Sequence, residues 1–372
     1  MEKKRLGDIC EIVTGATPKT NIKEFWDGDI NWITPAELTE DTYIINESLR
    51  KITTEGVEKT GLKSFPKGTV ILSSRAPIGK VAIAGCEMYC NQGFKNLVCS
   101  KQINNRFLYW YLKGHKEYLN SLGRGATFKE ISKAIVENIE ICLPTLEKQE
   151  KYADILEQCN GIIQIKKGQL RKLDTLVKSR FVELFGDPVI NSRGWKKALI
   201  GDDCFVTKLA GFEYTQYINY EDSGDVVMVK AQNVKNGKLN RKELSFVSNE
   251  VSDSLPRSQL APRDVVMTYV GANIGDVAII DNEYKYHLAP NVAKIRPDSE
   301  RYNSIYFMYM LMLLNAYIVK NSADTAKAAL GMERIRKLNV FVPPMELQNQ
   351  FADFVTFIDK SKSKIQKSLE ET

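Results

Sequence analysis

Side chains that can pair with nucleic-acid bases and phosphates gather in a few polar segments of this sequence. Arg can donate two hydrogen bonds to guanine, Asn or Gln can pair doubly with adenine, and Lys can neutralise phosphate. Such segments include "LSSRAPIGK", "NQGFKN" and "GRGATFK" in the first half, and "VKAQNVKNGK" and "MTYVGANIGD" in the second. Taken singly, each segment is equally well explained as a solvated turn. The candidate DNA-contacting residues are Ser73, Ser74, Arg75, Lys80, Asn91, Gln92, Arg124, Thr127, Lys129, Lys208, Lys230, Gln232, Asn233, Tyr269, Asn273, Asn291 and Lys327.

Residues for catalysis are scarce. His115 and His287 are the only histidines, and no GxxxxGK[ST] segment or Gly-rich cofactor loop occurs. The stretch "VPPM" resembles the segment with which amino-methyltransferases hold a target amine, but Val342 stands where Asp or Asn is required. "NEYK" (Asn282–Lys285) contains the ExK of a nuclease site, although a turn explains it better. We therefore expect no catalytic residues and no metal site, and keep a nuclease built on "NEYK" as an alternative.

Composition is that of a folded chain long enough for two or three domains. The 372 residues are 43% hydrophobic and 26% charged, and Lys plus Arg exceed Asp plus Glu by 52 to 46. This balance permits a polyanionic partner without requiring one. The start lacks the apolar core of a signal peptide, and the longest apolar run, Ile305–Val319, predicts a buried helix instead of a membrane span. Seven cysteines without paired CxxC spacing predict free thiols, and we expect a cytoplasmic protein.

The chain contains an internal repeat. "LPTLEKQEKYADILEQCN" (143–160) and "VPPMELQNQFADFVTFID" (342–359) match at an offset of 199, and "APIGKVAIAG" (76–85) matches "ANIGDVAIID" (272–281). A period this long excludes a solenoid. The repeated unit is therefore a domain followed by a helix, which occurs twice.

Apolar residues recur every seven positions after Pro144 and again after Pro343, as in a coiled coil. Two helices this long cannot both bury their apolar stripes on their own domains, so we expect them to pair antiparallel. Lys166 and Lys362 interrupt the pattern. The candidate coiled-coil and partner-docking residues are Gln149, Tyr152, Ile163, Leu170, Leu173, Val177, Gln348, Phe351, Val355, Ile358 and Ile365.

Each domain mixes strands and helices. "GTVILSSR", "KVAIAG" and "KNLVC" predict strands, as do "DVVMTYV", "DVAIID" and "VAKIRP", and one apolar helix follows in each repeat. The predicted fold is α+β, with two similar mixed α/β domains separated by two long antiparallel coiled-coil helices in a pseudo-two-fold repeat. The expected boundaries are 1–146 for the first domain, 147–185 for its helix, 186–345 for the second domain and 346–372 for its helix.

The paired Pro-x-x-E-x-Q helices, "IGKVAIA" and "IGDVAII", and the opening "LGDICEIVTGATPKTNIKEFWDGDINWITPAEL" resemble the specificity (S) subunit of type I restriction–modification systems. The resemblance covers essentially the whole chain and implies two target-recognition domains, each reading half of a bipartite site in double-stranded DNA. It implies helices that set the spacer and dock two methyltransferase subunits, with restriction subunits able to join. S-adenosylmethionine, ATP and Mg are then expected on those partners and not on this chain.

Two other classes of protein stay open on the residues alone. A non-catalytic scaffold would use the coiled coil and both domains to bind proteins only, and a nuclease would use "NEYK". Binding to DNA by the assembled complex separates the first from a specificity subunit, and magnesium-dependent cutting by the lone chain would favour the second.

Overall fold

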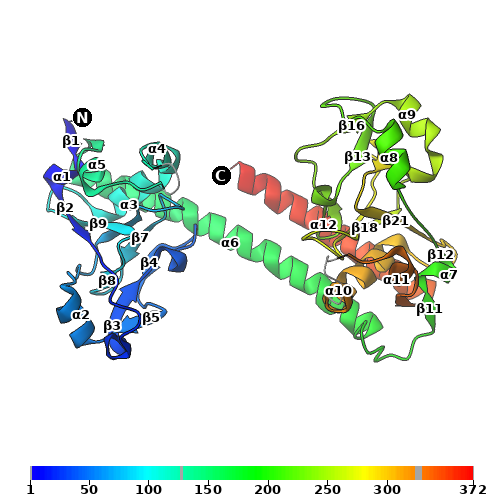
Figure 1. Cartoon of the computed structure of the whole chain (residues 1–372), viewed down its shortest axis with the longest axis horizontal. Coiled ribbons are helices and arrows are strands. Elements are labelled where there is room, and N and C mark those ends of the chain that lie inside the picture. The colour runs from blue at the N-terminus through cyan, green and yellow to red at the C-terminus, as the bar shows by residue number, and fades with distance from the viewer. Residues whose placement is uncertain (1, 126–128, 323–328, 372) are drawn as a thin grey trace. The chain divides into compact units, whose positions relative to one another are not determined.

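The computed structural model describes residues 2–125, 129–322 and 329–371, which form two compact units, Met1–Ile163 and Gln164–Thr372 (Figure 1). Each unit holds one copy of the repeated domain. Helix α6 (Leu146–Phe185) begins in the first unit and ends in the second. The predicted α+β composition and the duplication are both confirmed. Thr127 and Lys327, two of the candidate DNA-contacting residues, lie outside the described residues.

The first unit is built on a five-stranded sheet in the order β2-β9-β6-β7-β4. Its three central strands, β9, β6 and β7, are the predicted apolar runs. Successive residues of these strands point into hydrophobic cores on opposite faces of the sheet, so the strands are buried on both faces. Helix α3 packs on this sheet through Leu108 and Leu112. The bounds are β2 (Cys10–Thr14), β9 (Phe94–Cys99), β6 (Val70–Ser73), β7 (Val81–Ala84), β4 (Ile44–Ile45) and α3 (Asn105–Gly114).

A smaller sheet, β5-β3-β8, completes the first unit around the buried Trp32. Strand β8 runs parallel to β3, whereas β5 runs antiparallel to it. The pair β1–β10 joins the start of the domain to the segment just before α6. The remaining bounds are β1 (Glu2–Arg5), α1 (Leu6–Ile9), β3 (Trp26–Ile33), β5 (Arg50–Ile52), α2 (Thr54–Thr60), β8 (Tyr89–Cys90), α4 (Lys116–Ser121), α5 (Lys133–Glu137) and β10 (Glu140–Leu143).

The second unit repeats this plan. Its first sheet has the order β12-β21-β18-β19, which corresponds to β2-β9-β6-β7, and its second has the order β16-β13-β20-β17, in which β13 and β20 are again parallel. The terminal pair β11–β22 corresponds to β1–β10. The bounds are β11 (Lys197–Leu199), α7 (Ile200–Asp203), β12 (Cys204–Lys208), α8 (Gly211–Tyr217), β13 (Val226–Val229), β14 (Val234–Lys235), β15 (Lys238–Leu239), β16 (Phe246–Val247), α9 (Asn249–Ser254), β17 (Gln259–Leu260), β18 (Val265–Thr268), β19 (Val277–Ile279), β20 (Lys285–Leu288), β21 (Val292–Pro297), α11 (Met332–Arg336) and β22 (Asn339–Phe341).

Helix α10 (Ser304–Ser322) is the predicted apolar helix of the second unit. Tyr306, Phe307, Leu311 and Leu314 are buried in its largest hydrophobic core, which explains why the run is apolar all round. No helix within the described ranges is long and apolar enough to cross a membrane.

The predicted antiparallel helix pair is present within the second unit, between the C-terminal part of α6 and α12 (Met345–Glu370) (Figure 1). The Phe181 ring lies 5.3 Å from the Phe351 ring near the start of α12. Farther along, Lys362 forms an ion pair with Asp174, and the Lys166 Nζ donates to the Ser368 carbonyl at 2.8 Å. The contacting residues have rising numbers along α12 and falling numbers along α6, so the two helices are antiparallel. The two seam lysines therefore fix its register.

Candidate nucleic-acid interface

The first group of candidate residues lies where three strands of the five-stranded sheet begin or end. Thr14, the last residue of β2, pairs with Lys95 in β9, and Ser73, the last residue of β6, pairs with Phe94. The loops after β2 and β6 and before β9 therefore meet at one end of the sheet. The Thr17 hydroxyl donates to the Gln92 side chain at 2.6 Å and ties two of these loops together.

A fourth segment joins this end of the sheet. The backbone of Glu130 bridges to both Arg75 and Arg124, and the Ile131 N–H donates to the Ser74 carbonyl at 2.9 Å. We call the residues gathered here the first loop cluster; its candidate members are Arg75, Asn91, Gln92, Arg124 and Lys129. Four of them are exposed, whereas Asn91 is half-buried and accepts a hydrogen bond from the Gly93 N–H at 2.9 Å.

Three charged side chains form a chain of contacts inside the first loop cluster. The Arg75 Nε donates to one oxygen of Glu130 at 2.9 Å, and the Lys95 Nζ approaches the other oxygen at 3.2 Å. Lys95 also donates to the Ser74 hydroxyl at 3.1 Å. Burial by itself would raise the pKa of Glu130, but the hydrogen bonds from Arg75 and Lys95 outweigh it and lower that pKa. Glu130 is therefore an anion at neutral pH.

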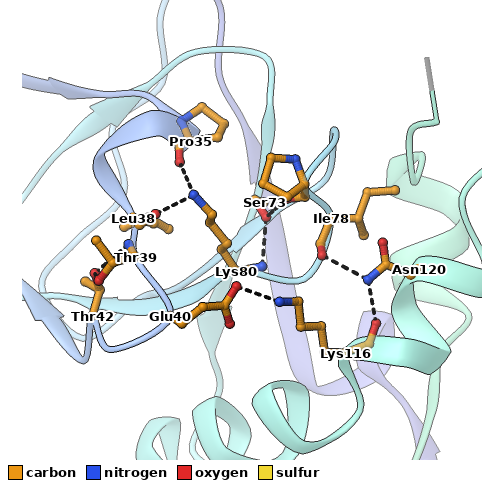
Figure 2. Close-up of polar contacts among 11 residues, drawn as sticks. Pro35, Leu38, Thr39, Glu40, Thr42, Ser73, Ile78, Lys80, Lys116 and Asn120 are labelled. Atoms are coloured by element: carbon orange, nitrogen blue, oxygen red, sulfur yellow. Dashed lines mark hydrogen bonds and ion pairs between the residues drawn. The ribbon is translucent and has the colours of Figure 1, made fainter. Parts of the chain in front are cut away.

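Ser73, Ser74 and Lys80 have structural partners instead of open faces. Both serines are fully buried, and the Ser73 hydroxyl donates to the Pro77 carbonyl at 2.8 Å while accepting from the Lys80 N–H at 2.9 Å. The Lys80 Nζ reaches the carbonyls of Pro35 and Leu38 at 3.3 and 2.5 Å (Figure 2). Lys80 thereby holds the 35–42 loop against β7. We therefore leave these three residues out of the interface.

The second group of candidates occupies the corresponding place in the second unit. The Tyr269 N–H donates to the Asn291 carbonyl at 2.9 Å, as Ser74 does to Gly93, and the Leu330 N–H donates to the Tyr269 carbonyl at 2.8 Å. The Lys208 Nζ lies 5.4 Å from the Tyr269 ring centroid. Here the ends of β12 and β18 and the start of β21 come together. The Ala289 N–H donates to the Val229 carbonyl at 3.2 Å, which brings the turn after β13 close to the start of β21. We call Lys208, Lys230, Gln232, Tyr269 and Asn291 the second loop cluster.

Not every candidate of the second unit faces solvent. Asn233 is buried, and its side chain donates to the Asn240 carbonyl at 2.9 Å and accepts from the Lys230 N–H at 3.1 Å. It closes the turn that carries Lys230 and Gln232, so we leave it out of the interface. Asn273 is exposed in the turn between β18 and β19.

Lys95, Glu130 and Thr17 are members of the first loop cluster that the sequence did not single out. Lys95 lies inside the quoted "NQGFKN" segment as the second residue of β9, and the sequence gave no hint of its role. Helix α8 adds exposed aromatic residues, Phe212 and Tyr217, directly after Lys208. Aromatic residues close to a lysine are typical of nucleic-acid binding, and this was the signal by which the sequence could have indicated α8.

Gln149 and Gln348 lie inside their own domains and not on a free helix face. Both glutamines are fully buried, and so is Phe351. Val355 and Ile358 are also buried, whereas Tyr152 is exposed. Val177 is buried in the core of the second unit, and Leu173 packs against that core. Ile163, Leu170 and Ile365 are half-buried.

The residues weighed for catalysis have other partners. Glu283 of "NEYK" and Asp281 both form ion pairs with Arg241, and the described ranges contain no group of three or more His, Cys, Asp or Glu residues placed to hold a metal. Burial lowers the pKa of His287, and His115 stacks on Tyr111 at the end of α3. No described feature favours the nuclease alternative.

The structure defines a class of proteins in which an α+β domain and a long helix occur twice, with equivalent loop clusters on the two domains. Comparison with known proteins finds a family that is also matched twice along this chain. The family model described as type I restriction modification DNA specificity domain matches residues 1–175 and again residues 193–372. The chain belongs to this family.

Relatives in the family match most of the chain. The type I restriction enzyme MjaIX specificity subunit of Methanocaldococcus jannaschii is 29% identical, over 95% of this chain and 85% of its own. The EcoBI specificity subunit of Escherichia coli is 21% identical over 77% of this chain and 66% of its own. The solved S subunit of M. genitalium has a TM-score of 0.56 at 14% identity, with 100% of this chain and 92% of that chain covered. A chain from a structure of type I complex assembly has a TM-score of 0.59 at 17% identity, with coverages of 100% and 93%.

Proposed function

We propose that this chain is the DNA-binding specificity subunit of a type I restriction–modification complex, and that each repeat reads one half of a bipartite site through its loop cluster. The observation that carries the proposal is the equivalence of the two clusters. Each forms at the same strand ends, with the same backbone hydrogen bonds at Ser74 and at Tyr269, yet with different exposed side chains. One scaffold used twice with different surface residues is what reading two different half-sites requires.

The helices take the role of spacer and docking site in this proposal. Helix α6 is continuous over 40 residues, and its antiparallel partner α12 has 26. Contacts of Lys362 and Lys166 hold the two helices together, so the pair resists changes in length. Exposed apolar residues on α6, among them Tyr152, Ile155 and Ile162, offer surface to partner proteins. We propose that two methyltransferase subunits dock there and that restriction subunits can join. The methylation chemistry, S-adenosylmethionine, ATP and Mg then reside on those partners.

The test is to map methylated adenines after expressing this chain with its partner methyltransferase in a methylation-free host. Inserting four helix-forming residues between Gly161 and Ile162 adds about 6 Å of helix. At 3.4 Å per base pair, we expect both half-sites unchanged and a spacer longer by roughly two base pairs. Four residues inserted after Asn191, in the linker that follows α6, serve as the control and should leave the spacer as it was. An altered half-site with an unaltered spacer would contradict the spacer role.

The alternative function, a scaffold that binds only proteins, is tested by a simpler gel-shift assay. The purified complex should retard duplex DNA in a gel, with tighter binding to the mapped site than to a shuffled duplex. A scaffold that binds only proteins would leave both duplexes unshifted.

A further inference from the structure

Arg75 is held in a way that leaves the two terminal N–H₂ groups of its guanidinium, here called its fork, available to a ligand. Its side chain is 46% exposed, and the contact to Glu130 is made by Nε. Among the residues that the structure describes, no hydrogen bond involves the two terminal nitrogens of Arg75. A guanidinium fixed through Nε keeps both terminal N–H₂ groups available for the O6 and N7 atoms of a guanine in the major groove.

Glu130 is itself held from the opposite side. The Lys95 side chain is only 7% exposed and contacts Glu130 and Ser74, so it cannot swing out to a phosphate. A buried lysine needs a partner for its charge, and Glu130 supplies it. The carboxylate is consequently fixed between two cations, which limits where the Arg75 guanidinium can lie.

The second domain argues against a purely structural role for these charges. The hydrogen bonds around Ser74 recur at Tyr269, so Arg75 and Glu130 correspond to Val270 and Ala329, which form the same backbone bridge. Lys95 corresponds to Ala293, because each pairs with the equivalent residues of the two neighbouring strands. The same backbone arrangement thus forms without any of the three charges.

We propose that Arg75 reads a guanine in the half-site bound by the first domain, and that Glu130, backed by Lys95, is the positioning residue that presents its fork. This inference rests on the proposed function and adds to it a chemical prediction: one half-site contains a G·C pair contacted by this domain. Preorganisation is the physical benefit, since a mobile arginine would lose side-chain entropy on binding.

The test uses the complex of the full chain with its methyltransferase, on duplexes that carry the mapped site and each of its single base-pair changes. Arg75→Ala should reduce the preference for G·C at one position of one half-site by about 5- to 150-fold, and the other positions should keep their preferences. Glu130→Gln should reduce the preference at that same position by a smaller factor, because Arg75 is still present but less constrained.

Two further variants separate positioning from folding. Lys95→Met combined with Glu130→Gln removes the buried Lys95 charge together with the carboxylate that it contacts, so no buried charge is left without a partner, and it should relax the same position. Asp8→Asn is the matched control, since Asp8 also accepts from an arginine Nε, that of Arg5 at 3.2 Å, and both side chains are exposed. It should leave every preference unchanged.

Three results would overturn the inference. One is a mapped site without a G·C pair in either half-site. Another is an Arg75→Ala complex that binds all duplexes equally more weakly with a reduced salt dependence, the behaviour of a phosphate contact. The third is a Glu130 variant in which every position weakens to the same degree. A wild-type complex that does not discriminate its mapped site from shuffled DNA would instead contradict the proposed function itself.

Discussion

Gln149 and Gln348 occupy the same place in the two repeats and make the same three hydrogen bonds. The Gln149 Oε1 accepts from the Asn104 N–H at 2.8 Å, and its Nε2 donates to the carbonyls of Gln102 and Pro144. Gln348 accepts from the Asn303 N–H at 2.8 Å and donates to the carbonyls of Arg301 and Pro343. Each glutamine thereby fastens the first turn of a long helix to the domain that precedes it.

Replacing either glutamine by leucine should therefore lower the free energy of unfolding by similar amounts. Each change removes the partner of one N–H and two carbonyls, in contacts that are buried at Pro144 and Pro343 and partly buried elsewhere, and we expect a loss of about 2–4 kcal/mol. Urea denaturation followed by circular dichroism measures it. Gln169→Leu, on an exposed face of α6, is the control and should stay within about 0.5 kcal/mol of the wild type. A negligible loss for Gln149→Leu or Gln348→Leu would show that these contacts do not fasten the helices.

The ion pair between Lys362 and Asp174 should contribute to the stability of the helix pair. The Lys362 side chain is only 15% exposed, so its charge is poorly solvated, and Asp174→Lys should destabilise the pair by about 1 kcal/mol or more. Adding Lys362→Asp restores a pair of opposite charges and should recover part of the loss, because Asp359, which lies 3.9 Å from the Lys362 Nζ, would then face a like charge. Thermal unfolding of the two single variants and the double variant gives the coupling energy. A coupling energy of zero would mean that the two side chains do not interact in solution.

Lys294 should make stability depend on pH in the alkaline range. It is buried and donates to the carbonyls of Arg257 and Gln259 at 2.6 and 2.7 Å. Burial lowers the pKa of Lys294 to about 8, against the pull of nearby Asp264, and Arg296 and Arg257 lower it further. The unfolded chain keeps this proton up to about pH 10.5. Between these values the unfolded state binds more protons, so the free energy of unfolding contributed by Lys294 rises with pH.

Urea denaturation at pH 7.5, 8.5 and 9.5 tests this pH dependence. The wild type should gain stability relative to Lys294→Met across the range, by at most about 1.4 kcal/mol per pH unit. Staying below pH 10 avoids the buried tyrosines, whose raised pKa values act in the opposite direction above that pH. Equal slopes for the two proteins would rule Lys294 out as the titrating group.

Local pattern in the sequence determined the repeat, the mixed strands and helices and the antiparallel pairing. Heptad spacing after Pro144 and Pro343 predicts helices close to Leu146–Phe185 and Met345–Glu370, because such spacing records which residues of one helix face a partner. The apolar strand runs are similarly local, since a buried strand needs only its own residues to be apolar. Side-chain type also identified two exposed polar residues, Arg75 in a loop and Lys208 at the end of β12.

Only the tertiary structure decided what individual polar residues do. Gln149 looks like a polar position on a docking face, and Lys80 looks like a phosphate contact, yet both satisfy backbone groups brought to them by distant segments. Arg75, Lys95 and Glu130 are far apart in the chain and become neighbours through strand pairing and loop closure. Whether a polar side chain is buried or free depends on which distant chain segments surround it, and a single sequence does not encode that locally.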